Sequence, residues 1–155
     1  MQRGGGALGR EPNMQYVCDG VGTRTWFRLE TAAEAVAESR DMNHAVEKYF
    51  SQTFDQATKS YVPPVSARVF EQNIGLKAHI QKAMPFFLTL RDNDGKALVT
   101  AMLPPGGRDD KTFRPIIVGP GNADPYVEHA EDIRKLGQHF KLTLDPARCF
   151  PYRRG

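Results

Sequence analysis

Long apolar runs are missing from this sequence, and their absence excludes a class of protein. No stretch approaches the roughly 18 to 20 consecutive apolar residues that a membrane-spanning helix requires. Residues 1–13, MQRGGGALGREPN, also lack the apolar segment that a secretory signal contains. We therefore expect a cytoplasmic protein that has no membrane partner.

Cysteine is scarce as well. The chain has 2 cysteines in 155 residues, Cys18 and Cys149, and they lie near opposite ends. Such a pair is not a disulfide framework, and neither cysteine has a second ligand at metal-binding spacing. We expect both thiols to be reduced and structural. The alternative is a reactive Cys149, because the cation of the adjacent Arg148 would lower the thiol pKa.

A large excess of one charge is also absent. The sequence has 21 lysines and arginines against 18 aspartates and glutamates, which gives a net charge of +3. A dedicated nucleic-acid binder usually carries a stronger basic excess or a concentrated basic patch. Hydrophobic residues make up 40% of the chain and charged residues 25%, which is ordinary globular composition.

The length of 155 residues most simply corresponds to one domain that buries its core without disulfides or metals. Residues 1–13 are rich in glycine and have no apolar periodicity, which predicts a disordered N-terminal extension. Met14 would make an equally good start of the chain. We place a single α+β domain at residues 14–155.

Helix signals dominate the first half of this domain. Thr31 and Glu34 match the capping box that begins a helix, and apolar residues then recur at helical spacing as far as Ala57. The helix must end by Tyr61, since two prolines follow. If unbroken, it would be about 40 Å long and would extend past the sheet or form part of a dimer contact. A second helix is expected at 73–83.

Strand signals surround these helices, and a final helix begins near Asp124. The expected strands lie at 14–18, 25–29, 86–91, 98–103, 113–118 and 141–144. The order is therefore β-β-α-α-β-β-β-α-β. We predict an α+β fold with a mostly antiparallel sheet of five to six short strands packed against about three helices. The last β-α-β unit would be a right-handed crossover with parallel strands.

The stretch IIVGPGNADPY at 116–126 resembles a phosphate-binding loop, because an apolar run stops at two glycines before a helix. A dinucleotide site needs three glycines at fixed spacing, and a Walker loop ends in Gly-Lys-Ser/Thr. Neither pattern is present. Asp124 and Pro125 are a good helix start by themselves, and a carboxylate there would repel a phosphate. The favoured interpretation is a loop that turns a strand into a helix.

Acidic residues near this loop suggest a metal site as the alternative. If the strands run as predicted, the segments that carry these residues lie at the same edge of the sheet. They are 92–95, 119–124 and the end of the last strand at Asp145. Carboxylate and amide oxygens are the ligands that Mg²⁺ and Ca²⁺ prefer. The candidate ligands are Asp92, Asp94, Asn122, Asp124 and Asp145. Against this site, Asp and Asn are favoured at turns for backbone reasons alone.

The loop at 104–112 offers a different kind of site. It combines two glycines with the cations Arg108 and Lys111, and Arg114 follows closely. Such a group could grip the carboxylate or phosphate of a small anionic ligand. The alternative is a solvated, charge-rich loop without a ligand.

Basic residues elsewhere suggest contact with single-stranded nucleic acid or with an acidic partner. They lie on the second helix and in the end segment RCFPYRR, and comprise Lys77, Lys82, Arg148, Arg153 and Arg154. The favoured interpretation is a solvated helix face and a loose tail. We do not expect nucleic acid as the main partner.

Catalytic motifs are absent. His44 lies three residues before Glu47, and His129 lies three residues before Asp132, so each pair can share a helical face. No metalloprotease, hydrolase or deaminase motif accompanies them. We expect exposed helical histidines and no cofactor.

Three functions remain open. The first is a small cytoplasmic binding or accessory protein that forms a homo-oligomer through the long helix or an open sheet edge. The second is a small enzyme or ligand-binding domain that acts on a phosphorylated or carboxylated metabolite through the loop at 104–112. The third is a weak nucleic-acid binder. The first is favoured because no set of nucleophile, base and orienting group is visible.

Overall fold

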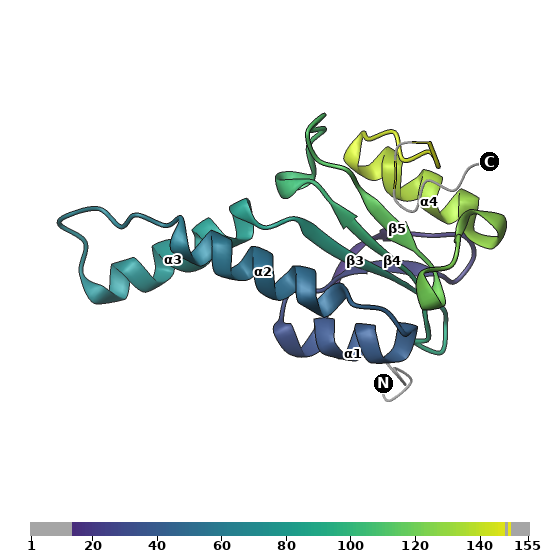
Figure 1. Cartoon of the computed structure of the whole chain (residues 1–155), viewed down its shortest axis with the longest axis horizontal. Coiled ribbons are helices and arrows are strands. Elements are labelled where there is room, and N and C mark those ends of the chain that lie inside the picture. The colour runs from purple at the N-terminus through teal and green to yellow at the C-terminus, as the bar shows by residue number, and fades with distance from the viewer. Residues whose placement is uncertain (1–13, 148, 150–155) are drawn as a thin grey trace.

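The computed structural model describes residues 14–147 and Cys149. The elements in this part of the chain are β1 (Gln15–Asp19), β2 (Thr25–Arg28), α1 (Ala32–Met42), α2 (Val46–Lys59), α3 (Val69–Ala83), β3 (Phe86–Arg91), β4 (Ala97–Leu103), β5 (Ile116–Val118) and α4 (Tyr126–Phe140). Two short 3₁₀ turns, η2 (Pro105–Gly107) and η3 (Pro120–Asn122), flank β5. Figure 1 shows α1 and α4 beside one sheet, and α2 leading away from the sheet to α3.

The described strands form a single antiparallel sheet in the order β1-β2-β3-β4-β5, so neighbours in sequence are also neighbours in space. Strand β2 pairs with β3 although three helices separate them in the chain, and Arg28 lies opposite Leu88. Because consecutive strands alternate in direction, β3 and β5 end at the same edge. The α+β class and the mostly antiparallel sheet are therefore confirmed.

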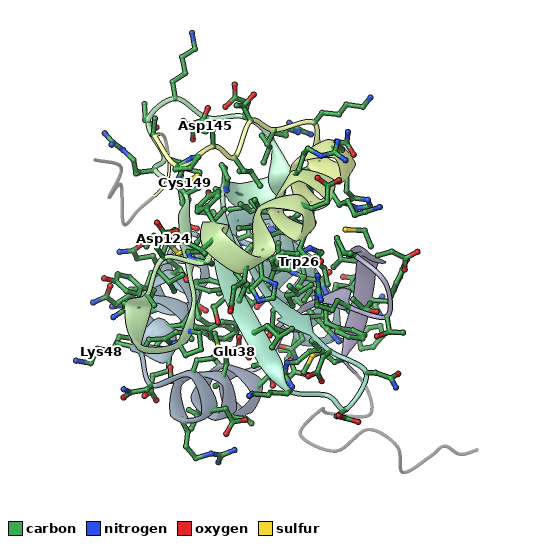
Figure 2. All side chains as sticks on the ribbon, turned by 90° about the vertical axis from the view of Figure 1, so that its right-hand side faces the viewer. Trp26, Glu38, Lys48, Asp124, Asp145 and Cys149 are labelled. Atoms are coloured by element: carbon green, nitrogen blue, oxygen red, sulfur yellow. The ribbon has the colours of Figure 1, made fainter. Side chains whose placement is uncertain are left out.

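Helices cover both faces of the sheet. Helix α4 lies on one face, and α1 and α2 lie on the other (Figure 1). In the side view of Figure 2, Trp26 of β2 lies beside α4, and Glu38 is a residue of α1. This double cover explains why five of the six residues of β3 are buried. No helix among the described residues is both long and apolar enough to cross a membrane.

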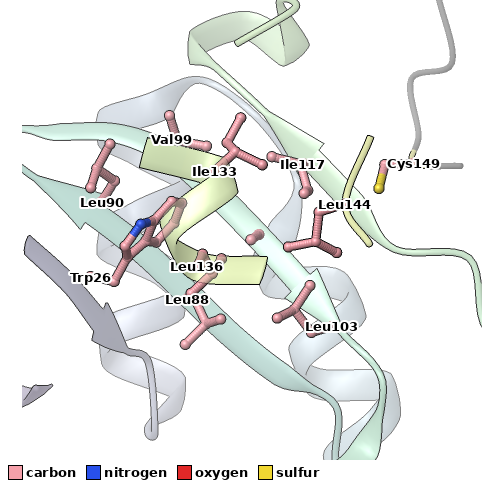
Figure 3. Packing of buried hydrophobic residues seen from close by; sticks show 11 residues of the cluster. Trp26, Leu88, Leu90, Val99, Leu103, Ile117, Ile133, Leu136, Leu144 and Cys149 are labelled. Carbon is pink, nitrogen blue, oxygen red and sulfur yellow. The ribbon is translucent and has the colours of Figure 1, made fainter. Parts of the chain in front are cut away.

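The core beneath α4 is the larger of two apolar clusters, and Figure 3 shows its side chains. Its members come from β2, β3, β4, β5, α4 and the segment after α4. They are Trp26, Leu88, Leu90, Val99, Ala101, Leu103, Ile117, Ile133, Leu136, Leu144 and Cys149. Burying each of the larger aliphatic side chains stabilises the fold by about 1.5–3 kcal/mol.

The core on the opposite face joins α1 and α2 to the sheet. Phe87 of β3 meets Phe50 of α2 with ring centroids 5.2 Å apart. Phe27, Leu29 and Ala35 extend this cluster toward the start of α1. The cluster also includes Val46 and Ala57, so it holds one face of α2 along most of the helix.

Helix α1 begins as the sequence predicts. The Thr31 hydroxyl accepts a hydrogen bond from the Glu34 N–H at 3.1 Å, and the Glu34 carboxylate accepts one from the Thr31 N–H at 3.1 Å. These two bonds satisfy N–H groups that the first helical turn leaves without partners. The predicted capping box is confirmed.

The single long helix expected up to Tyr61 is in fact divided into α1 and α2. Asn43 ends α1 in the left-handed conformation, with φ 54° and ψ 57°. Asn tolerates this conformation better than most residues. The Ser39 hydroxyl then accepts from the Glu47 N–H at 2.9 Å, which closes the joint. Helix α3 also starts earlier than expected, at Val69.

The strand predicted at 141–144 is wrong, and with it the parallel crossover. Lys141 ends α4 in the left-handed conformation, and the Leu142 N–H donates to the Gly137 carbonyl at 2.8 Å. The chain therefore turns back over α4, where Leu144 joins the core and its carbonyl accepts from the Tyr126 hydroxyl at 2.8 Å. The segment is not a strand of the described sheet.

Candidate functional site

A two-helix arm leaves the body of the protein. Helices α2 and α3 run side by side away from the sheet, and the segment that joins them lies at the far end (Figure 1). None of the fifteen residues of α3 is buried. We call residues 60–75, the joining segment and the first half of α3, the arm tip.

The arm tip exposes large apolar side chains. They are Val62, Val65, Val69, Phe70 and Ile74, and their exposed fractions run from 57% to 106%. Phe70 and Ile74 are four residues apart and therefore share one face of α3. Isolated apolar residues on a surface are ordinary, but several large ones close together in the sequence of a projecting element indicate an interaction surface.

Specific contacts hold the arm tip in shape. The Ser60 hydroxyl lies 2.7 Å from His79 Nε2, and the rings of Tyr61 and His79 are 5.5 Å apart. Gly75 allows the Tyr61 hydroxyl to lie directly against α3, because a Cβ at this position would collide with it. The exposed apolar surface therefore sits on a defined helical hairpin.

A second unusual feature is an ion pair inside the body. The Arg91 Nη2 donates to Glu38 Oε1 at 2.8 Å, and both side chains are almost fully buried. The cross-strand partners Thr89 and Thr100 lie beside the pair. Burial raises the pKa of the Glu38 carboxyl, while the Arg91 cation and the two hydroxyls act in the opposite direction.

His44 extends this network toward the surface. The Thr100 hydroxyl donates to Glu38 Oε2, so its oxygen accepts from His44 Nε2 at 2.9 Å. His44 Nδ1 in turn accepts from the Val46 N–H at 3.4 Å. These partners assign a neutral imidazole with its proton on Nε2. Burial lowers the His44 pKa, which also favours the neutral form.

This arrangement does not form a nucleophile and base. A catalytic base needs an unprotonated nitrogen facing the hydroxyl that it activates. His44 instead donates a hydrogen bond to the Thr100 hydroxyl, and this hydroxyl donates a hydrogen bond to the Glu38 carboxylate. The chain from His44 to Arg91 therefore serves to join α1, the α1–α2 joint and the sheet.

Asp132 forms a separate buried hub. Its carboxylate accepts from the Val21 N–H at 2.6 Å, from Arg24 Nε at 2.9 Å and from His129 Nδ1 at 3.0 Å. Its own carbonyl accepts from Trp26 Nε1 at 3.0 Å. These bonds attach the β1–β2 turn to α4. Three protein donors bind the Asp132 carboxylate, which therefore has a structural role.

His44 and His129 differ from the prediction of exposed helical residues, whereas His139 is exposed on α4 as expected. The pairing of His129 with Asp132 on one face of a helix is confirmed, but the His129 side chain is only 13% exposed. His44 lies between helices and contacts Thr100. The three-residue spacing correctly predicted that His129 pairs with Asp132. It did not predict that His44 contacts Thr100 instead of Glu47.

Three of the predicted metal ligands accept hydrogen bonds from the backbone of their own turn. Asp92 Oδ1 accepts from the N–H groups of residues 94 and 96, Asp124 Oδ1 from that of residue 126, and Asp145 Oδ1 from that of residue 147. Figure 2 shows Asp124 and Asp145 at separate places. Among the described residues, no group of three or more acidic, histidine or cysteine side chains could hold a metal. Asp94 is exposed at the tip of its hairpin.

The loop at 104–112 lies at the opposite end of β5 from the glycine turn, as expected. Arg108, Lys111 and Arg114 are all exposed. Gly107 has φ +66° and packs against the ring of Phe140, where a Cβ would collide. The loop is therefore anchored to α4 through Gly107.

Only two of the five basic residues predicted to contact nucleic acid or an acidic partner lie among the described residues. Lys77 and Lys82 are exposed on α3, five residues apart, and so point in different directions. Arg148, Arg153 and Arg154 lie outside the described residues. Lys77 shares a helix face with Phe70 and Ile74 and thus borders the arm tip.

The stretch at 116–126 acts as the strand-to-helix turn that the sequence favours. Strand β5 ends at Val118, η3 follows, and Asp124 accepts from the Tyr126 N–H at 2.9 Å at the start of α4. Of the two cysteines, Cys149 is completely buried and Cys18 is partly buried; both are free thiols. Burial at Cys149 argues against the reactive alternative.

Sequence reasoning missed Glu38 and Arg91. A signal was present, since Glu38 falls on the same helix stripe as the buried Ala35 and Met42. Arg91 alternates with Leu90 in a strand whose two faces are both covered. The alternation of residues does not show which faces are covered, and only the tertiary arrangement shows that both faces of β3 are buried.

Comparison of the chain with family models, with curated proteins and with solved structures found no match. The functional conclusion therefore depends on the geometry described above.

Proposed function

We propose that this is a small binding or accessory protein that associates with a second copy of itself through the arm tip. The observation that carries the proposal is helix α3, a fifteen-residue helix without a buried residue. An amphipathic helix gains most of its stability from packing its apolar face. The face that carries Phe70 and Ile74 has no cover among the described residues.

The size of the exposed patch supports an interface. The five apolar side chains of the arm tip together expose on the order of several hundred Å², which is the range that marks interaction surfaces on soluble proteins. A standard interface buries roughly 800 Å² on each partner. The arm tip with its polar rim is of the right order for that area.

The chemistry of the patch favours a copy of the same surface. At the start of α3, the N-cap residue Arg68 and Glu71 of the first turn have opposite charges, and the Arg68 backbone N–H donates to the Glu71 carboxylate at 2.9 Å. A nearly neutral apolar face is self-complementary, as a twofold interface requires. Two helical hairpins that pair in this way form a four-helix arrangement with a shared core.

The proposal includes a cytoplasmic location. Free thiols at Cys18 and Cys149 are compatible with a reducing compartment. The two other functions considered from the sequence, a metabolite site at 104–112 and weak nucleic-acid binding, remain predictions.

Two matched variants test the proposal. Val69→Asp places a carboxylate in the first turn of α3, and Val127→Asp does the same in α4, also a fifteen-residue helix. Both valines are exposed, by 73% and 87%, so neither change disturbs the core. Light scattering should give the mass of a dimer for the wild type and Val127→Asp, and that of a monomer for Val69→Asp. A wild-type protein that stays monomeric at high concentration would contradict the proposal.

A further inference from the structure

A small cavity lies beneath the start of α2, above the free edge of the sheet. Its volume is about 130 Å³. Two cross-strand pairs form its floor: Thr100 with Val118, and Met102 with Ile116. The α1–α2 joint and the first turn of α2 form its wall, and Asn122 of η3 stands at the rim. Helix α1 contacts β4 beside the cavity, and β5 is the last strand of the sheet among the described residues.

We propose that this cavity binds a small uncharged molecule of about the size of one aromatic ring, with a single hydrogen-bonding group directed at Asn122. The volume decides the size, because an apolar cavity of roughly 150 Å³ accommodates benzene. The lining decides the polarity, since five of its nine residues are aliphatic and the other four, His44, Tyr49, Thr100 and Asn122, carry no charge at neutral pH. This inference is independent of the dimer proposed above.

Charge on the ligand is excluded by the lining. No lysine, arginine, aspartate or glutamate lines the cavity among the described residues. His44 is the histidine in the lining. Its imidazole is neutral in the network described above, and its Nε2–H donates a hydrogen bond to the Thr100 hydroxyl. Burial lowers the His44 pKa, so the imidazole does not supply a cation at neutral pH. A carboxylate or ammonium would therefore be buried without a partner, which is strongly unfavourable.

Asn122 supplies the polar anchor. Its side chain makes no hydrogen bond that the described residues show, whereas the hydroxyl of Thr100 is engaged by Glu38 and His44. Its backbone has φ +63°, and η3 fixes it at the rim through an Asn122 N–H bond to the Gly119 carbonyl at 3.1 Å. The amide can donate to or accept from a hydroxyl or carbonyl group of the ligand.

Phenol, benzene and benzoate are the probes that test this site. Amide chemical shifts followed by NMR during titration report both affinity and location. Phenol should bind most tightly, with the largest shifts at Ala45, Val118 and Asn122. Benzene should bind more weakly by about fivefold, the factor that one hydrogen bond contributes. Benzoate should not bind.

Variants distinguish the contribution of the cavity volume from that of the hydrogen bond to Asn122. Ala45→Leu and Ile116→Phe fill the cavity from the wall and from the floor, and each should abolish phenol binding. Asn122→Gly keeps the positive φ and removes the amide, so phenol should fall to the affinity of benzene. Ala33→Leu, an exposed change on α1, is the control and should bind phenol as the wild type does.

The proposal is overturned if no probe binds, if benzoate binds as well as phenol, or if the shifts lie outside the cavity. It is also overturned if phenol binds equally to Ala45→Leu and Ile116→Phe while both variants remain folded by circular dichroism. If Asn122→Gly keeps the full preference for phenol, the assignment of Asn122 is wrong.

Discussion

Glu38 and Arg91 lie 53 positions apart in the chain, and their side chains meet in an ion pair of 2.8 Å inside the protein. The guanidinium also donates to the Thr89 hydroxyl at 3.0 Å and to the Gly95 carbonyl at 3.1 Å. These bonds compensate in part for the cost of removing two charges from water. The pair fixes α1 on the sheet and thereby positions the base of the arm.

Removing one member of this pair should be strongly destabilising. Arg91→Met leaves the Glu38 carboxylate buried without its cation, and the free energy of unfolding should fall by about 3–5 kcal/mol. Urea unfolding measures the loss. The combined variant Glu38→Leu with Arg91→Met should lose less than Arg91→Met alone, because no charge is then left unpaired. If the double variant loses the sum of both single changes, the two side chains do not interact as described.

Acid should weaken the fold through His44. The unfolded chain takes up a proton near the ordinary pKa of 6.5, whereas the folded protein resists this because burial lowers the His44 pKa. The stability from neutral His44 is thus complete above pH 6.5 and is lost as the pH falls through the lowered folded value. In urea unfolding between pH 7.5 and about 5, the wild type should lose more stability than His44→Gln. Parallel curves for the two proteins would exclude this role.

Asp132 should matter far more than its neighbour Glu131. Asp132→Ala removes the acceptor of Val21, Arg24 and His129, and the free energy of unfolding should fall by about 2–3 kcal/mol. Glu131 pairs with Arg134 on the solvent side of α4, where both side chains are about half exposed. Glu131→Ala should produce no measurable change. Equal losses in the two variants would show that the Asp132 hub is not a major support.

Cys18 should react slowly with alkylating reagents. Burial, with a further contribution from the Asp19 carboxylate, raises the pKa of its thiol to about 11. Its thiolate fraction at pH 8 is then lower than that of a free cysteine by about two orders of magnitude. Mass spectrometry of an iodoacetamide time course should show slow labelling in buffer and fast labelling in urea. Equally fast labelling in both solutions would contradict the environment described for Cys18.

Local signals predicted the parts of the fold that depend on local contacts. The capping box at Thr31 and the hairpin of β3 and β4 are determined by residues close in sequence, and both are found. The break at Asn43 was hidden because Met42 and Val46 continue the apolar stripe across it. The segment after α4 has strand-like residues but closes over Gly137 instead.

The site residues depended on contacts that no local pattern encodes. Glu38 meets Arg91 and Thr100 only because α1 folds onto β3 and β4. The exposed surface of α3 is invisible in its sequence, because Leu76 and Ile80 have the spacing of a core-facing stripe. Helical periodicity predicts which residues share a face, and only the tertiary arrangement shows whether that face is covered.

The most direct test of the central claim is hydrogen exchange of the arm tip at low and high protein concentration. A second copy that covers α3 should slow amide exchange at 69–76 as concentration rises in the wild type, while α4 stays unchanged. Val69→Asp should remove this difference, and Val127→Asp should keep it. If exchange at 69–76 is the same in the wild type and in Val69→Asp at every concentration, the arm tip does not bind a second copy.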